Sequence, residues 1–199
     1  MRNIRKCIAA SALVVSAVVL ALPGTASAAS PSSTHIAGAV AIEAQSNKTD
    51  NQFRFQIAQT NSAVINAFNG AYSTTTGCKN CGAAAVSFQV IYATSPKAAV
   101  VNAGNEAKAY SYRCANCNNL AAAYQFIVID PSAQPSQSER QALAGIQAQL
   151  KSLKNDENLA DNVDELAGEV VSTLQGNAQR SIAGSGRSVT VNQQVQTAS

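Results

Sequence analysis

"VINAFNGAYSTTTGCKNCGAAAVSFQVIYAT" (residues 64–94) aligns without gaps with "VVNAGNEAKAYSYRCANCNNLAAAYQFIVID" (residues 100–130) at a fixed offset of 36. Eleven of the 31 aligned positions are identical, including both cysteines of a CxxC pair, an asparagine between them and a glutamine downstream. Self-similarity at a fixed period is typical of repeated supersecondary units. The sequence therefore predicts an internal duplication.

Each repeat unit reads as a hairpin with CxxC at its tip. The second arms, at 85–94 and 122–130, are rich in β-branched and aromatic residues, as strands are. In the first arm of the second unit, Ala107, Ala109 and Ser111 alternate with Lys108, Tyr110 and Tyr112, which is the period of a strand. The alanines after each CxxC would also tolerate a helical turn, and we predict strands.

Two further segments alternate upstream, at 35–45 and 52–60, with the turn-like "SNKTDN" (46–51) between them. One more hairpin before the duplicated pair would give about six strands in an antiparallel sheet or sandwich. This β-repeat domain is predicted to span residues 29–134, after which Pro131 and Pro135 end the strands.

A helical hairpin is predicted at residues 135–178. Ser136 and Glu139 have the spacing of a capping box, and apolar residues follow at helical spacing. These residues are Leu143, Ile146, Leu150 and Leu153, then Leu159, Val163, Leu166, Val170 and Leu174. The predicted fold class is therefore α+β. The tail at 179–199 is predicted to be disordered, although "SVTVNQQVQ" (188–196) alternates enough to add an edge strand.

Residues 1–28 have the pattern of a secretory signal peptide. Three cations (Arg2, Arg5 and Lys6) precede an apolar run at 7–22, and Ala26-Ser27-Ala28 supplies a small-x-small cleavage pattern. The apolar run is shorter than the roughly 20 residues that a membrane-spanning helix needs. We expect a secreted protein that does not insert into the membrane after cleavage.

Signal removal also changes the charge of the chain. The full sequence has 14 basic and 11 acidic residues, and the signal peptide contains three of the basic residues and none of the acidic ones. The remaining chain thus has 11 of each sign. A net charge of zero gives no electrostatic reason to expect nucleic acid or anionic lipid as a partner. The expected partner is an extracellular protein or a component of the cell envelope, of identity unknown.

The four cysteines after the signal peptide, Cys78, Cys81, Cys114 and Cys117, allow three chemistries. An even cysteine set in an exported protein favours disulfides. Two CxxC pairs also have the spacing of a four-cysteine zinc ribbon. Thiol–disulfide exchange is the third alternative, although a redox CxxC ordinarily opens a helix after a strand, and these pairs precede predicted strands.

Within the disulfide interpretation, the pairing stays open. Loop closure favours cross-links between the two units, at about 4 kcal/mol each against about 2 kcal/mol for a local bridge. The duplication favours local pairs, because each unit would have been self-sufficient. We predict Cys78–Cys81 and Cys114–Cys117.

The residue inventory argues against an enzyme. His35 is the only histidine, so HExxH is absent, and we expect His35 to be an exposed loop side chain. The sequence contains no glycine-rich phosphate loop in its predicted globular part. We predict no catalytic residues, no cofactor and no bound metal.

The paired motifs resemble an actinobacterial family of exported proteins of unknown function, in which CxxC precedes FQ or YQF twice and a helical hairpin follows. The likeness covers about residues 37–176. It is also similar to the C-terminal extracytoplasmic region of proteins labelled peptide zinc metalloproteases. Their membrane-embedded peptidase region is absent from this chain, so the resemblance implies no peptidase activity. It implies a stand-alone, cysteine-bonded module.

The sequence thus predicts a secreted, non-catalytic β-repeat module that acts by binding or as a structural extracellular protein. An extracytoplasmic zinc-binding protein is the first alternative, and a thiol–disulfide oxidoreductase is the second.

Overall fold

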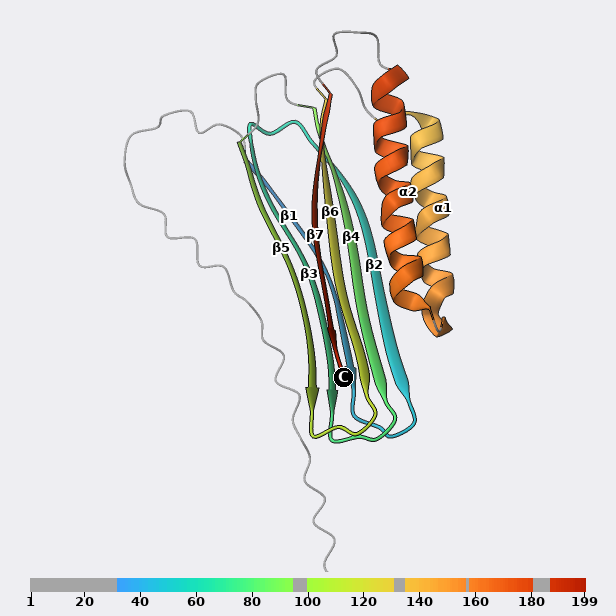
Figure 1. Cartoon of the computed structure of the whole chain (residues 1–199). Helices are drawn as coiled ribbons and strands as arrows, with labels where there is room; N and C mark the ends of the chain where they lie inside the picture. The colour runs from blue at the N-terminus through green and yellow to red at the C-terminus, as the bar shows by residue number, and fades with distance from the viewer. Residues whose placement is uncertain (1–31, 95–99, 131–134, 157, 181–186) are drawn as a thin grey trace, which may run out of the picture.

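The structure is a computed structural model that describes residues 32–94, 100–130, 135–156, 158–180 and 187–199. The predicted signal peptide lies outside these residues. The elements, in chain order (Figure 1), are β1 (Ser32–Glu43), β2 (Thr49–Thr60), β3 (Val64–Thr76), β4 (Gly82–Ala93), β5 (Val100–Tyr112), β6 (Asn118–Ile129), α1 (Gln137–Ser152), the 3₁₀ turn η1 (Leu153–Asn155), α2 (Leu159–Arg180) and β7 (Ser188–Ala198).

The strands form two sheets between which the chain alternates. Sheet A has the order β1-β3-β5, and sheet B has the order β2-β4-β6-β7. Each of the strands β1 to β4 pairs in parallel with the strand two further along the chain, and β6 and β7 pair antiparallel. The chain therefore winds as a solenoid of three coils, each with one strand in each sheet (Figure 1).

The α+β class with a C-terminal helical hairpin is confirmed, and the strand pairing needs a correction. The arms of each CxxC unit run in opposite directions, as in a hairpin, but they lie in different sheets and do not form an antiparallel ladder with each other. The link from β3 to β4 leaves room for this geometry, because it is longer than a two-residue hairpin turn. Two of its residues, Gly77 and Asn80, have left-handed backbones with φ of 64° and 52°.

The offset of 36 seen in the sequence is the hydrogen-bonding register of the second and third coils. Val64 pairs with Val100, and Gln89 pairs with Gln125. The first coil stacks on the second with an offset of 33 in sheet B, where Phe55 pairs with Phe88. Chemically similar residues consequently lie on neighbouring strands, separated by the strand spacing of about 4.8 Å.

Alanine fills the space between the two sheets. The cluster there consists of Ala39, Ala41, Ala71, Ala83, Ala85, Ala109, Ala121 and Ala123. Small side chains let the sheets approach closely, and most of the larger apolar residues of sheet B point outward instead. A separate buried cluster contains Ile65 and Ile91. The alanine-rich stretches after each CxxC are strands, as predicted.

Buried amides form ladders within this narrow interior. The Nδ2 of Asn69 donates to Asn105 Oδ1 at 3.0 Å and to the carbonyl oxygen of Ser87 at 3.1 Å, and the Ser87 hydroxyl donates to Asn69 Oδ1. Gln125 donates to Gln89 at 2.9 Å. Each ladder supplies polar partners that buried amides need, so it fixes the register of neighbouring coils.

Helices α1 and α2 cover the outer face of sheet B. All nine apolar helical positions predicted from the sequence pack there, against outward side chains such as Phe88, Tyr124 and Phe126. The Phe88 and Tyr124 rings stack with centroids 4.8 Å apart. Half of the predicted capping box is present, because the Ser136 hydroxyl accepts the Glu139 backbone N–H at 3.1 Å, whereas the Glu139 carboxylate has other partners.

Two expectations about the ends of the chain are wrong. Residues 188–198 are not disordered but form β7, the edge strand that their alternation allowed. The side chains of Gln194 and Gln196 accept the backbone N–H groups of Ala107 and Ala109, so β7 also covers the free edge of β5. His35 is not in a loop: it lies half-buried on β1, paired with Ala67.

Replacing Asn69 with alanine tests the ladder. The substitution leaves the Ser87 hydroxyl and carbonyl oxygen without their buried partner, so we expect unfolding free energy to fall by about 2–4 kcal/mol. Asn66→Ala is the matched control, since Asn66 lies on the same strand but accepts from Asn102 at the surface, and it should cost about 0.5 kcal/mol. Urea unfolding of both variants measures the difference, and equal effects would contradict the ladder's role.

Candidate functional site

The two CxxC turns stack directly on each other at one end of the solenoid. Their backbones are joined by a parallel bridge between Lys79 and Ala115. The Asn80 N–H donates to the Ala115 carbonyl at 2.9 Å, and the Ala115 N–H donates to the Cys78 carbonyl at 3.3 Å. The turn of the first coil joins the stack, because Asn80 Nδ2 donates to Asn47 Oδ1 at 3.1 Å. The register of the strands thus continues through the turns.

This stacking gathers all four predicted cysteines. Their sulfur atoms lie within 4.8 Å of one another, and three of the four side chains are buried. Cys78 with Cys81, and Cys114 with Cys117, lie at disulfide distance, with Cα atoms 6.2 and 5.9 Å apart. The two pairs also touch, because Cys81 Sγ lies 3.0 Å from Cys117 Sγ and 3.5 Å from Cys114 Sγ. The cysteines therefore form one cluster and not two separate pairs.

A cavity of about 700 Å³ opens beside this cluster. Cys81 lines it together with asparagines from two strands and two turns and with residues that follow α1. The asparagines are Asn51, Asn80, Asn116, Asn118 and Asn119. Solvent therefore reaches the edge of the sulfur cluster through a polar cavity.

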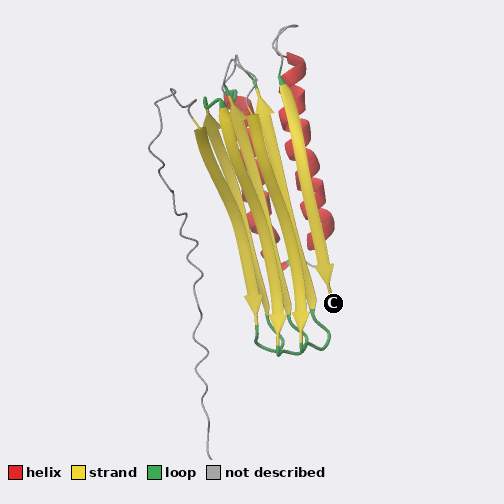
Figure 2. Cartoon of the chain, turned by 90° about the vertical axis from the view of Figure 1, so that its left-hand side faces the viewer, coloured by secondary structure: helices red, strands yellow, loops and turns green. Residues whose placement is uncertain are grey.

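A second candidate is the outer face of sheet A, which none of the described helices covers (Figure 2). Large apolar side chains project from its edge strand β1: Ile36 is 65% exposed, Val40 57% and Ile42 61%. Phe68 on β3 and Tyr110 and Tyr112 on β5 are 40–58% exposed. We name these six residues the sheet A patch. Contiguous exposed apolar side chains of this kind mark contact surfaces.

Glycines keep the sheet A patch flat. A Cβ atom at Gly70 would lie 2.9 Å from the Tyr72 ring and 3.2 Å from the Phe68 ring, and one at Gly104 would lie 3.1 Å from the Phe68 ring. The rings therefore lie along the sheet over glycine backbone and do not stand away from it. The result is a level apolar surface.

One ion pair, between Glu106 and Lys108 of β5, lies beside the sheet A patch. Hydrogen bonds from Lys108 and from the Tyr72 hydroxyl lower the pKa of Glu106, and the bond with Glu106 raises the pKa of Lys108. Burial and the hydrogen bond to Glu106 raise the pKa of Tyr72 to about 12. At neutral pH the face thus carries one fixed charge of each sign at this position.

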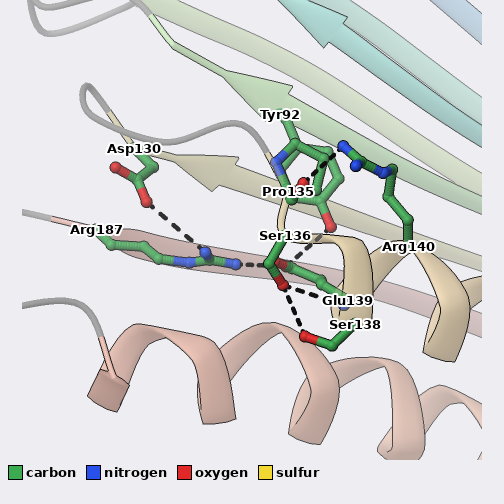
Figure 3. A network of polar contacts seen from close by, with 8 residues as sticks. All are labelled: Tyr92, Asp130, Pro135, Ser136, Ser138, Glu139, Arg140 and Arg187. Atoms are coloured by element: carbon green, nitrogen blue, oxygen red, sulfur yellow. Dashed lines mark hydrogen bonds and ion pairs between the residues drawn. The ribbon is translucent and has the colours of Figure 1, made fainter.

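Figure 3 shows a buried polar network. It lies where β4 and β6 end, and the cysteine turns precede the start of these strands. Glu139 of α1 accepts from the Tyr92 hydroxyl at 2.9 Å and from Arg187 at 2.6 Å. Arg187 also lies 3.7 Å from Asp130. All three charged side chains are at most 5% exposed. Burial, followed by the charge of Glu139, raises the pKa of Tyr92.

This network has a structural role. It connects β4, the end of β6, the start of α1 and the residue that precedes β7. Arg187 brings a positive charge to the buried carboxylates of Glu139 and Asp130. The network therefore anchors both the helical hairpin and β7 to sheet B.

No family model matches the chain, and neither a curated protein nor a solved structure is significantly similar to it. The resemblance to the actinobacterial exported family stays a prediction. In the part of the chain that the structure describes, no helix is long and apolar enough to cross a membrane.

Sequence reasoning identified the four cysteines and missed the other two features. The sheet A patch was visible as apolar residues alternating with alanine in "HIAGAVAIE" (35–43), but either set could have faced the core. Arg187 lies in the segment interpreted as a disordered tail. Glu139 was noted only as a helix cap, which is one of its two roles.

Replacing Arg187 with methionine tests the network. Because Glu139 and Asp130 would remain buried without their cation, we expect a loss of about 3–5 kcal/mol in unfolding free energy. Adding Glu139→Gln to this variant should restore part of the loss. Arg140→Met is the control, since the exposed Arg140 donates to the Pro135 carbonyl outside the network, and it should have little effect. If Arg140→Met lowered the unfolding free energy as much as Arg187→Met does, in thermal or urea unfolding, the result would contradict this account.

Proposed function

We propose that this chain is a secreted, non-catalytic structural protein that pairs with a second copy of itself through the sheet A patch. The observation that carries the proposal is the asymmetry of the sandwich. The helical hairpin covers the apolar outer face of sheet B, whereas the outer face of sheet A leaves isoleucine, valine and phenylalanine side chains 40–65% exposed. Covering such a surface removes apolar area from water and stabilises the assembly.

The chemistry of the face favours a copy of the same surface. Its apolar residues need an apolar, level partner, and the sheet A patch is itself apolar and level. Glu106 and Lys108 lie two residues apart on one strand, so a two-fold rotation can bring the acid of one copy to the base of the other. Isologous interfaces require this kind of self-complementarity.

The two ends of the solenoid favour a closed pair over a growing fibre. At the N-terminal end, Asp50 and Arg54 lie on the edge strand β2 at positions that pair with the interior residues Ala83 and Ser87, and charged side chains on an edge strand oppose strand addition. Asp50 Oδ2 also accepts the outward N–H of Ile42 on β1. At the C-terminal end, the glutamines of β7 cover the edge of β5.

A thiol–disulfide oxidoreductase is less well supported. An attacking thiolate must be reached by its substrate, and Cys78, Cys81 and Cys117 are only 3–5% exposed. We propose that these cysteines are oxidised in the secreted protein, where the local bridges stabilise the stacked turns.

The test uses protein collected from the culture medium, which should begin near Ala29. Sedimentation at increasing concentration should show a monomer–dimer equilibrium. Substituting serine for both Ile36 and Ile42 should weaken the dimer by more than about tenfold, because each residue is lost from both copies.

The matched control replaces Val191 and Val195 with serine. These residues are 40% and 43% exposed, on the outer face of the edge strand β7 of sheet B. The control should dimerise like the unmodified protein. A protein that stays monomeric at all concentrations, or a dimer disrupted by the β7 pair and not by the β1 pair, would overturn the proposal.

A further inference from the structure

We propose that the four cysteines, once reduced, form a single site for one divalent d¹⁰ cation such as Zn²⁺. The oxidised protein would contain two disulfides, and the reduced protein would contain one tetrathiolate metal centre in their place. The proposal concerns the sulfur cluster alone and does not depend on pairing through sheet A.

The geometry is close to that of a tetrathiolate site. Four sulfurs around Zn²⁺ at about 2.3 Å lie about 3.8 Å from one another. In this chain all four sulfurs lie within 4.8 Å of one another, and three of the four pairs from different turns are already 3.0–3.5 Å apart. Once the disulfides open, small rotations of the side chains would bring the four sulfurs to these separations.

The backbone, and not the disulfides, holds the two turns together. Hydrogen bonds join them at four points, from Gly77 to Tyr112, between Asn80 and Ala115, from Ala115 to Cys78 and from Asn118 to Cys81, at 2.9–3.3 Å. The parallel strands on either side of the turns fix the same register. Reduction therefore leaves the four thiols gathered, and the fold has already prearranged the ligands.

The surroundings suit a site that carries net negative charge. Four thiolates around a dication leave a charge of −2, which nearby cations stabilise. Lys79 and Arg113 each adjoin a cysteine in sequence. Cys114 is only partly buried, and Cys81 borders the 700 Å³ cavity, so a metal ion has a path to the cluster.

The exchange conserves atoms and electrons. A dithiol reductant gives two electrons and two protons to each disulfide and becomes a disulfide itself, so two equivalents yield four thiols. Zn²⁺ then displaces the thiol protons as it binds. In reverse, two equivalents of hydrogen peroxide take four electrons from the four thiolates, yielding two disulfides, water and free Zn²⁺.

The test titrates Zn²⁺, and Co²⁺ as its spectroscopic substitute, into the full secreted protein after reduction and anaerobic removal of the dithiol. One equivalent per chain should bind, and Co²⁺ should give the visible absorption of a tetrahedral thiolate centre. Two equivalents of peroxide should release the metal and restore both disulfides, as measured by mass. Two bound equivalents, or none, would overturn the proposal without any variant.

Variants locate the site. Cys114→Ser should weaken binding by more than about tenfold and change the Co²⁺ spectrum, because the second turn supplies ligands to the same ion. Ala115→Ser, in the same stack but with no change of sulfur or charge, keeps the backbone hydrogen bonds of Ala115 and should keep one equivalent and the same spectrum. Circular dichroism confirms that each variant folds. Undiminished binding in Cys114→Ser would show that Cys78 and Cys81 bind metal alone, which contradicts a shared site.

Discussion

Parallel, in-register pairing of equivalent strands is the constraint on which the rest of the structure depends. It places residue i beside residue i+36 from Val64 to Ile129, so a feature of one coil meets the same feature in the next. Asparagine meets asparagine, glutamine meets glutamine, and CxxC meets CxxC. Equivalent residues of the two repeat units are therefore in contact with each other in the fold. The sulfur cluster is one of these contacts.

The same register explains how apolar residues divide between the faces. Alanine and hydrogen-bonded amides fill much of the narrow space between the sheets, with Ile65 and Ile91 in a separate buried cluster, and most of the other large apolar side chains point outward. Sheet B covers these side chains with the helical hairpin, which the Glu139–Arg187 pair fixes in place. Sheet A has Ile36, Val40 and Ile42 on the corresponding face, and a second copy of the chain would complete it as the helices complete sheet B.

Much of this architecture could be predicted from the sequence. The duplication identified which residues of the two units are equivalent, although it did not predict that these residues pair with each other. Helical spacing identified the core face of both helices, and the alternation of Ala107 and Ala109 with Tyr110 and Tyr112 separated the two faces of β5. The local cysteine pairs were also expected, and they lie at disulfide distance. These features depend on local periodicity, which a single sequence displays.

The remaining features depend on contacts between distant segments. Opposite strand directions fit both a hairpin and two strands facing each other across a sandwich, and alternation alone does not say which strand supplies the hydrogen bonds. Residues 188–198 form β7 only because β6 offers an edge and Arg187 finds Glu139 and Asp130. The sheet A patch could not be predicted for the same reason. A period-two pattern separates the two faces of a strand but does not indicate which face is exposed to solvent.

The most direct test of the account is NMR of isotopically labelled protein, read for contacts between strands. The stacked solenoid predicts parallel-type backbone NOEs that connect β3 to β5 and β4 to β6, with partners 36 residues apart, such as Ala71 with Ala107 and Val86 with Ala122. An antiparallel hairpin would instead bring α-protons of β3 and β4 together, because facing Cα atoms at non-hydrogen-bonded pairs lie about 4.5 Å apart. Strong α-proton contacts between β3 and β4, with none at an offset of 36, would contradict the account.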